Sequence, residues 1–508
     1  ANFKETLPEL PSPLGLSFLE QFMERYILEP YRRMGCQIPE GVSSVRTFKG
    51  RPYINMTLFS SLIAQLRGDP SLMTEQMGGE TLVRPPEVRP LGWFALARAG
   101  MVMMSEMRKA VSQGPAWFAE MKAMVAEQRA DRIRTLSGED IALRLDTLAK
   151  WLDERELTFA IAGGVAQCLQ ALGGLLPRWL GEDWRALLNG ALQGQSAVIS
   201  AQQIVQLAEI VDMVRRDPSV TSLFTAERWD PDEVRRKLDG TDVLRAFYRY
   251  LDDYGHRGVG ESDPMALRFA DRPELLLTVL RTQILAQASA TPADILQRQT
   301  MVRERALAEI RTRFGWRFYR WAIFSWWYRR LCRFFALREA NRHHLMYYSA
   351  ATRSLLLRLG EWLVEQGRLS SQEDIFYLTI DARADLLAGR ASDWKEMIQA
   401  RRAERDRNAT VSVPDTVQDW RDMVRGTYAS SVVAPDEIFR GIPISGGQVV
   451  GPVRFVRSME DWSRVCRGDI LVVSVIDPGL APLFGVAAGL IAEMGGTLSH
   501  GAIIAREY

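Results

Sequence analysis

Histidine and cysteine are both scarce in this chain. Its 508 residues include only four histidines, so chemistry that depends on an imidazole has very few possible positions. These histidines are His256, His343, His344 and His500. The cysteines are also four, far apart and never in C-x-x-C spacing: Cys36, Cys168, Cys332 and Cys466. This spacing excludes a zinc ribbon and provides no disulfide framework, so a reducing cytoplasm is the expected compartment.

The chain also lacks a charge imbalance and long apolar runs. It has 64 Lys and Arg against 62 Asp and Glu, whereas domains that bind nucleic acid through bulk charge are clearly basic. The most apolar stretch, residues 316–335, is interrupted by five arginines, and no apolar run approaches the ~20 residues of a membrane span. Residues 1–15 have no charged segment followed by an apolar one, as a signal peptide would. We therefore expect a cytoplasmic protein with neither a nucleic-acid nor a membrane partner.

Helical periodicity dominates the sequence from about residue 58 to residue 403. Residues 140–152, for example, place apolar side chains at i, i+3, i+4 and i+7, which is typical of a half-buried helix. Breaks are expected in the segment 173–177, which contains two glycines and a proline, and again at Pro218. The pattern predicts a large helical region.

Shorter segments complete the first part of the chain. Residues 16–31 predict a helix, and residues 45–57 are β-branched and aromatic around a Gly-Arg-Pro turn, which predicts a short hairpin. Residues 404–437 are polar and contain proline, as expected of a linker. We expect residues 1–437 to form one mostly helical domain.

The composition changes after residue 437. Residues 446–456, 468–474 and 489–493 are short β-rich runs bounded by glycine and proline. Strands that alternate with short helices are typical of an α/β module. The predicted fold class is therefore mainly α, followed by a small α/β module over residues 438–508.

A glycine–histidine turn near the C-terminus carries the strongest chemical signal. A predicted strand runs into Gly495 and Gly496, whose missing Cβ atoms let backbone N–H groups approach a ligand closely. The apolar residues beyond His500 start a helix, and a helix N-terminus favours an anion such as phosphate. An imidazole held there can act as a nucleophile that carries a phosphoryl group, with Thr497 and Ser499 as hydroxyl donors. The alternative is that His500 only caps the helix.

A second constellation lies in residues 252–264, where three glycines fall within six residues. Arg257 can form bidentate bonds to a phosphate or carboxylate, and His256 can act as a general base on a hydroxyl. The alternative is an ion-paired loop in which Glu261 and Asp263 simply hold Arg257.

An aromatic and arginine-rich helix is predicted over residues 314–348. Five apolar side chains follow one helical face: Trp321, Phe324, Tyr328, Leu331 and Phe335. We interpret this face mainly as core, and it is also compatible with the wall of an apolar pocket for a bulky aromatic or polyketide acceptor.

Four polar residues follow on the same helix. Arg338 and Arg342 form an i, i+4 pair that could neutralise a phosphoryl group. His343 and His344 are adjacent and cannot both face one metal ion, so no metal site is predicted there. These two histidines are expected on the helix surface or in a pocket wall.

The residues around His500 resemble a known motif. The run GGTLSHGAIIAREY at residues 495–508 is similar to the phosphohistidine motif of the swivelling domain in phosphoenolpyruvate-utilising enzymes. Upstream segments fit the same domain: residues 441–447, 468–473 and 477–479. The resemblance covers roughly residues 440–508 and implies that His500 receives phosphate from ATP. It also implies a domain that would continue past Tyr508.

Other segments resemble the rifampin phosphotransferase group over nearly the whole chain. They are residues 7–18, 50–57, 254–263, 337–339 and 374–377. In that group an ATP-grasp domain binds Mg-ATP and phosphorylates the swivelling histidine, which then visits a helical acceptor domain. The resemblance implies that the ATP-grasp domain would precede Ala1, in cis or as a separate subunit. A chain without it is expected to be inactive alone.

The expected activity is a dikinase-type, ATP-dependent transfer of phosphate through His500 to a hydroxyl of a bulky small molecule. Rifamycin-like antibiotics are the acceptors that the resemblance implies, with a role in antibiotic resistance. His256 is the candidate base, and the candidate substrate or phosphate contacts are Arg257, Glu261, Arg338 and Arg342. Three alternatives remain: a ligase of the prodigiosin-synthesising type, a phosphoenolpyruvate synthase, and a non-enzymatic protein that binds an apolar ligand. The pyruvate-binding barrel of phosphoenolpyruvate synthase follows its swivelling domain, whereas the acceptor-type region here precedes His500.

Overall fold

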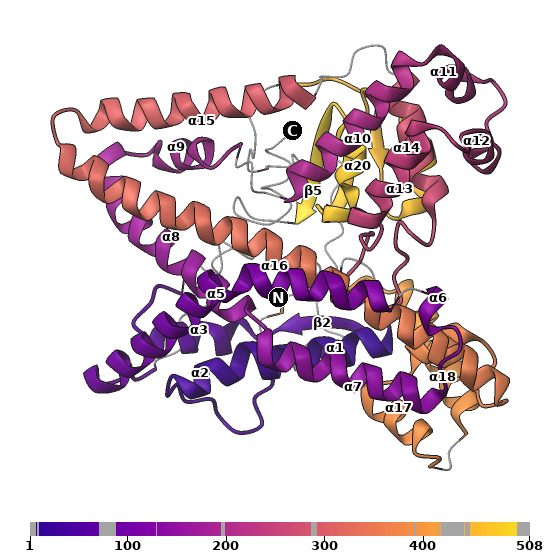
Figure 1. The fold of residues 1–508 in the computed structure, drawn as a ribbon. Helices are drawn as coiled ribbons and strands as arrows, with labels where there is room; N and C mark the ends of the chain where they lie inside the picture. The colour runs from indigo at the N-terminus through magenta and orange to yellow at the C-terminus, as the bar shows by residue number, and fades with distance from the viewer. Residues whose placement is uncertain are drawn as a thin grey trace. The chain divides into compact units, whose positions relative to one another are not determined.

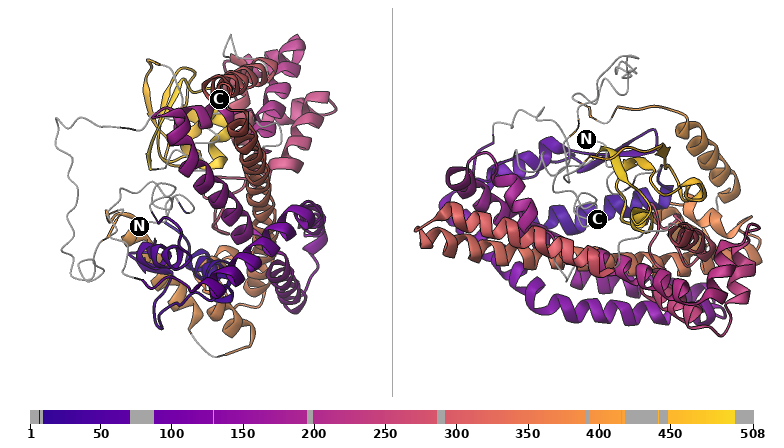
Figure 2. Two further views of the ribbon diagram at one scale, coloured as in Figure 1. Left: turned by 90° about the vertical axis from the view of Figure 1, so that its left-hand side faces the viewer. Right: turned by 90° about the horizontal axis from the view of Figure 1, so that it is seen from above.

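The computed structural model describes residues 7, 10–70, 88–128, 130–194, 199–285, 292–390, 393–414, 416–417, 441 and 448–494. These residues are mainly helical, which confirms the predicted fold class (Figures 1 and 2). The chain divides into two compact units that alternate along the sequence. Unit 1 contains residues 1–160, 260–266 and 344–442, and unit 2 contains residues 161–259, 267–343 and 443–508.

Unit 1 begins with a longer helix than the sequence predicted. It runs through α1 (Pro13–Phe22), the π-helical η1 (Met23–Leu28) and α2 (Glu29–Arg33). Ser12 caps α1 by accepting a hydrogen bond from the Gly15 N–H, and Pro13 supplies a backbone already suited to the first turn. The cap fixes the start of this helix, which becomes important for the candidate site.

The predicted hairpin is present, but its turn lies earlier than expected. Strands β1 (Val45–Phe48) and β2 (Arg51–Ile54) pair antiparallel around Lys49 and Gly50. Both turn residues have positive φ, 48° and 71°, which is the geometry that matches the twist of a two-residue hairpin. Pro52 therefore belongs to β2, where an edge strand tolerates its missing N–H.

The other elements of unit 1 are helical. They are α3 (Met56–Gln65), α5 (Trp93–Glu127), α6 (Ala130–Ile133), α7 (Gly138–Arg155), the 3₁₀-helix η2 (Gln372–Tyr377), α17 (Ile380–Leu387) and α18 (Trp394–Ala409). A capping box of Ser137 and Asp140 starts α7, and the predicted apolar stripe of this helix is buried. The linker predicted from residue 404 begins later, because strong helix formers continue α18 to Ala409.

Unit 2 contains most of the remaining helices. They are the main part of α8 (Thr158–Leu180), α9 (Trp184–Ala191), α10 (Ile199–Arg216), α11 (Pro218–Thr225), α12 (Pro231–Lys237), α13 (Asp242–Tyr254), α14 (Pro273–Leu285) and α15 (Pro292–Phe314). The 48-residue α16 (Phe318–Glu365) starts in unit 2 and ends in unit 1. Within unit 2, α9 lies along α15 (Figure 1).

One predicted break is confirmed and the other is wrong. Asp217 caps α11 through the N–H groups of Ser219 and Val220, so the chain does break before Pro218. By contrast, α8 continues through residues 173–177 and ends only at Gly181, which has φ of 74°. Its stripe of buried leucines outweighs the weak helix propensity of the two glycines: Leu169, Leu172, Leu176 and Leu180.

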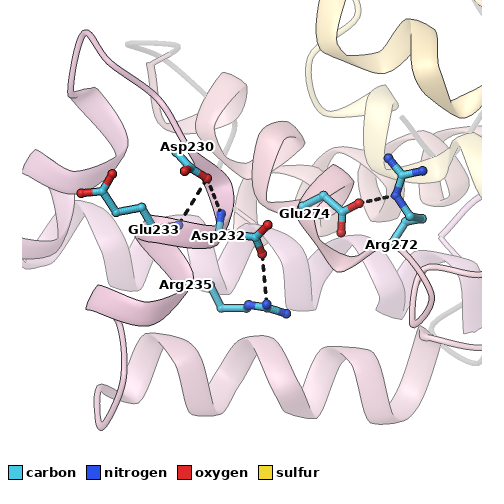
Figure 3. Close-up of polar contacts among 6 residues, drawn as sticks. All are labelled: Asp230, Asp232, Glu233, Arg235, Arg272 and Glu274. Atoms are coloured by element: carbon cyan, nitrogen blue, oxygen red, sulfur yellow. Dashed lines mark hydrogen bonds and ion pairs between the residues drawn. The ribbon is translucent and has the colours of Figure 1, made fainter.

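The region around α12 shows charged residues in a purely structural role (Figure 3). Asp230 caps α12 by accepting hydrogen bonds from the N–H groups of Asp232 and Glu233, at 3.0 and 3.3 Å. Asp232 pairs with Arg235 one turn later, and both are solvent-exposed. Such exposed pairs contribute little to stability, and this acidic cluster is explained by helix capping.

The predicted α/β module contains a three-stranded parallel sheet. Its strands are β3 (Val453–Phe455), β4 (Ile470–Val475) and β5 (Gly489–Met494), in the order β3-β4-β5. The connections are η3 (Met459–Arg464), and η4 (Pro478–Leu480) with α20 (Ala481–Phe484). Each of the three β-rich runs of the sequence therefore corresponds to one strand, with β4 and β5 each ending one residue beyond the predicted run. The boundary predicted near residue 437 lies outside the described residues.

This sheet shares one hydrophobic core with helices of unit 2. Leu471 and Val473 of β4 are buried with Trp462, and they belong to the same cluster as Phe247 of α13 and Leu280 of α14. In both views of Figure 2 the yellow strands lie beside the magenta helices of this unit. Residues 443–508 are thus packed into unit 2.

Among the described helices, one stretch meets the length and composition criteria of a membrane span. It covers residues 138–180, which include α7 and α8. Of its most apolar window, 44% is buried. A core helix meets the same criteria, so this stretch is weak evidence for a membrane segment.

Candidate functional site

The loop after α13 buries the predicted pair His256 and Arg257. Helix α13 ends at Tyr254, and the two following polar residues are only 7% and 3% exposed. Backbone hydrogen bonds hold the loop: the Arg257 N–H donates to the Tyr254 carbonyl at 2.9 Å, and the Phe269 N–H donates to the Arg257 carbonyl at 2.8 Å. The main chain under both candidate side chains is therefore fixed.

His343, which belongs to helix α16, lies against this loop. Its ring lies 4.6 Å from the His256 ring, edge to face, and 5.8 Å from the Tyr254 ring. Its Nδ1 lies 3.4 Å from an Nη1 of Arg257. His343 is 6% exposed, so of its two expected positions the helix surface is excluded, and a place in a pocket wall remains a prediction.

The most buried polar residues in this part of α16 are not the two arginines that the sequence analysis selected. The arginines of the predicted pair, Arg338 and Arg342, are half-buried. Their neighbours Glu339 and His343, also four residues apart, are 4% and 6% exposed. The sequence signal that could have identified this buried face was the second i, i+4 pair, because residues four apart place an acid and an imidazole on one side of a helix. The predicted phosphate contacts of Arg338 and Arg342 remain predictions.

The aromatic face predicted on α16 is mostly core. Phe324, Leu331 and Phe335 are buried, and Tyr328 donates a hydrogen bond from its hydroxyl to the Ala191 carbonyl at 2.7 Å. Trp321 is half-buried. This face therefore packs α16 into unit 2.

Two buried tyrosines of α13, Tyr254 and its neighbour Tyr250, remain uncharged next to this loop. Burial raises the pKa of Tyr254 above its ordinary value, and Asp253 raises it further, while the charge of Arg257 acts in the opposite direction. Burial also raises the pKa of Tyr250, against the hydrogen bond that Gln203 donates to its hydroxyl at 3.0 Å. Both phenols therefore stay protonated at neutral pH.

The turn after β4 touches the same loop. A Cβ built on Gly479 would lie 2.5 Å from the carbonyl carbon and oxygen of Gly258, and 2.7 Å from the Val259 nitrogen. Only glycine permits this approach of two backbones. Asp477, which is 3% exposed, shapes the turn by accepting a hydrogen bond from the Gly479 N–H at 2.7 Å.

The register of the sheet relates this turn to the start of the glycine–histidine motif. Met494 at the end of β5 pairs with Val475 at the end of β4. Because carboxyl ends of parallel strands meet at one edge, β5 ends at the edge that carries the Asp477–Gly479 turn. The predicted phosphate-carrying residues themselves lie outside the described residues: Gly495, Gly496, Thr497, Ser499 and His500.

Two other segments with family resemblance meet in unit 1. The Asp263 carboxylate accepts hydrogen bonds from the Ser12 N–H and hydroxyl at 2.6 and 2.7 Å, and from the Met265 N–H at 3.0 Å. A Cβ on Gly15 would lie 2.7 Å from this carboxylate, so glycine is required there. Asp263 thus fixes the start of α1. Glu261 is fully buried, and its carbonyl accepts a hydrogen bond from the Ser349 hydroxyl at 3.2 Å.

Replacing Asp263 by alanine should destabilise the 508-residue chain by about 3 kcal/mol, because two buried donors of Ser12 lose a charged acceptor. Thermal unfolding followed by circular dichroism measures the loss. Asp385→Ala, which removes an exposed ion pair with Arg390 in the same unit, is the control and should change stability by less than about 1 kcal/mol. Equal melting temperatures for the two variants would contradict this role of Asp263.

Two family models match the chain. Residues 155–339 match the fourth domain of rifampicin phosphotransferase, and residues 465–508 match the mobile domain of PEP-utilising enzymes. The first match includes the loop with His256 and Arg257 as well as His343's neighbour on α16, Glu339. The second includes the Asp477–Gly479 turn and the glycine–histidine motif.

Curated relatives are similar over much of this chain. A rifampicin phosphotransferase of Streptomyces sviceus is 30% identical over 353 residues, which are 66% of this chain and 38% of that protein. A rifampicin phosphotransferase of Bacillus subtilis is 28% identical over 356 residues, 65% of this chain and 38% of that protein. An uncharacterised protein of Mycobacterium tuberculosis is 30% identical over 315 residues, 61% of this chain and 33% of that protein. This chain therefore spans less than two fifths of the length of these relatives.

These matches confirm the family predicted from the motifs at both ends and in the middle of the chain. One match covers the helical segment with the buried His256 loop, and the other covers the module with the glycine–histidine motif. Over residues 155–339 and 465–508 the chain is similar to the rifampicin phosphotransferase-like family of PEP-utilising enzymes.

Proposed function

We propose that this chain forms the acceptor and carrier portions of an ATP-dependent phosphotransferase of the dikinase type. His500 carries the phosphoryl group, and the acceptor is a hydroxyl of a bulky small molecule such as a rifamycin-like antibiotic. Mg-ATP binds to an ATP-grasp part, in cis or on a separate subunit. The enzyme works in the cytoplasm and needs neither nucleic acid nor membrane.

The contact between Gly479 and Gly258 carries this proposal. It joins the carboxyl edge of the carrier sheet to the loop that holds His256 and Arg257. The family names support phosphoryl transfer, and the contact supports the place where the second transfer occurs. A phosphohistidine delivered from this edge meets a buried base and a buried guanidinium.

The reaction has two halves. In the first, a nitrogen of His500 forms a bond to a phosphorus atom of ATP as one P–O bond breaks, and water cleaves a second P–O bond of the triphosphate. His500, ATP and water thus yield phosphohistidine, AMP and inorganic phosphate. In the second, the acceptor hydroxyl oxygen bonds to this phosphorus and the N–P bond breaks. His256 takes the hydroxyl proton, while Arg257 and Arg338 balance the charge of the phosphoryl oxygens. The phosphorylated acceptor then leaves.

The test uses the longer protein that contains this chain together with its ATP-binding part. It is incubated with ATP and rifampicin, and the peptide that carries His500 is examined by mass spectrometry under conditions that preserve phosphohistidine. The proposal expects a phosphorylated peptide before rifampicin is added, and phosphorylated rifampicin afterwards. A peptide that never gains phosphate would contradict the proposal. A condensed product would identify the ligase alternative instead.

Gly479→Ala tests the contact between carrier and acceptor loop. The added methyl group overlaps the Gly258 backbone and must displace the turn, and a displacement of about 1 Å slows a positioned reaction by roughly 100-fold. We expect phosphohistidine to form normally but to discharge to rifampicin roughly 10- to 100-fold more slowly. Rapid-quench measurement of a single turnover separates the two steps.

Gly174→Ala is the matched control, because a Cβ at this position of α8 meets no atom within 4 Å. This variant should discharge at the wild-type rate. If Gly479→Ala also discharges at that rate, the Gly479–Gly258 contact has no part in the transfer.

A further inference from the structure

His343 is a buried polar residue that the proposed mechanism does not use. It comes from α16, whereas His256 and Arg257 come from the loop after α13. We propose that His343 is a positioning residue: its Nδ1 accepts a hydrogen bond from Arg257 and fixes the guanidinium beside His256. This inference rests on the proposed function, because it assigns the orientation of Arg257 a role in phosphoryl transfer to the acceptor.

The contact determines which nitrogen of His343 carries a proton. The guanidinium group has only donors, so the nitrogen that faces it at 3.4 Å must act as the acceptor. A neutral imidazole has one donor and one acceptor nitrogen, which places the proton on Nε2. A second proton on Nδ1 would bring two cationic N–H groups into contact. His343 is therefore a neutral ring with an unprotonated Nδ1.

The contact with His343 acts on the side chain of Arg257. The backbone hydrogen bonds to Tyr254 and Phe269 fix only its main chain, and the guanidinium lies at the end of a flexible side chain. Bidentate recognition of phosphate requires a defined plane of the guanidinium. Helix α16 supplies a rigid support for His343, and the ring of His343 also contacts His256 at 4.6 Å. His343 thus orients the guanidinium of Arg257 and packs against His256, the candidate base.

Two substitutions separate the hydrogen bond from the packing. His343→Asn keeps an acceptor near the position of Nδ1 in a smaller side chain. His343→Leu keeps apolar bulk and removes the acceptor. His344→Leu is the matched control on the next residue, whose ring stacks on Phe118 of unit 1 at 4.6 Å.

The first readout is discharge of preformed phosphohistidine to rifampicin in the longer protein. We expect His343→Leu to discharge roughly 100-fold more slowly, and His343→Asn to stay within about threefold of wild type. All three variants should form phosphohistidine from ATP at the wild-type rate. The proposal is overturned if His343→Leu discharges as fast as wild type, or if His343→Asn is as slow as His343→Leu.

The second readout needs neither ATP nor an acceptor. The 508-residue chain is labelled with ¹⁵N-histidine, and nitrogen NMR at neutral pH reports the protonation of each ring. With only four histidines, the signal that disappears in His343→Asn identifies residue 343. We expect an unprotonated Nδ1 and a protonated Nε2, and a proton on Nδ1 overturns the proposal. Failure of the wild-type protein to form phosphohistidine contradicts the proposed function, whereas a protonated Nδ1 contradicts the role of His343.

Discussion

His500→Ala is expected to abolish ATP-dependent phosphorylation of the acceptor in the longer protein. The alanine side chain has no nitrogen to form the N–P bond, so no covalent intermediate can form. Removing the nucleophile of a hydrolase lowers kcat on the order of a million-fold, and a comparable loss is expected here. The measurement is product formation from labelled ATP and rifampicin, with mass spectrometry of the peptide that carries residue 500.

Binding should survive this change. Because the acceptor loop with His256 and Arg257 is unaltered, rifampicin should bind His500→Ala as it binds the wild type, measured by calorimetry. His344→Ala serves as the control for loss of an imidazole and should keep its activity. Undiminished phosphorylation in His500→Ala would exclude a phosphohistidine at this position, and a binding protein would then be the better description.

His256→Gln is expected to give the second-largest effect. His256 is 7% exposed in the loop that contacts the carrier turn, and its proposed role is to take the proton of the acceptor hydroxyl. Loss of a general base typically slows a step by 10²- to 10⁴-fold, so discharge of phosphohistidine should slow by about this factor. Formation of phosphohistidine from ATP should not change. Glutamine retains polarity and approximate size, which limits the effect on folding.

The pH dependence of phosphohistidine discharge tests whether His256 acts as the base. A general base must be unprotonated to act, so discharge by the wild type should slow as the pH is lowered. The slow residual discharge of His256→Gln should lose that dependence. A variant that discharges at the wild-type rate with the same pH profile would place the base elsewhere.

Local structure was largely predictable from the sequence because short-range rules govern it. The periodicity of residues 140–152 predicted the body of α7, and Pro218 predicted the break before α11. The errors have tertiary causes. Helix α8 passes through two glycines because its leucine stripe is buried, and the hairpin turn moved to Lys49 and Gly50 because strand twist favours two residues with positive φ.

The candidate site was predictable only in part, because its contacts join distant residues. The glycine-rich loop identified His256 and Arg257, but His343 comes from another helix 86 residues after Arg257. One partner of Asp263 is Ser12, 251 residues earlier. Residue types suggested that Asp263 and Arg257 belong to one ion-paired loop. No local pattern indicated that this carboxylate also anchors the first helix.

The core shared by the C-terminal sheet and the helices of unit 2 sets an energetic condition on carrier movement. Trp462, Leu480, Leu483 and Val486 are each less than 5% exposed within this core. Exposing four such side chains to water costs roughly 6–12 kcal/mol, at about 1.5–3 kcal/mol each. The state in which the C-terminal sheet has left this position is therefore rarely populated, unless another surface buries a similar apolar area. In the cycle proposed above, the part that charges His500 would therefore need an apolar surface of its own. The time that the carrier spends at each position would then depend on matched hydrophobic surfaces as well as on chemistry.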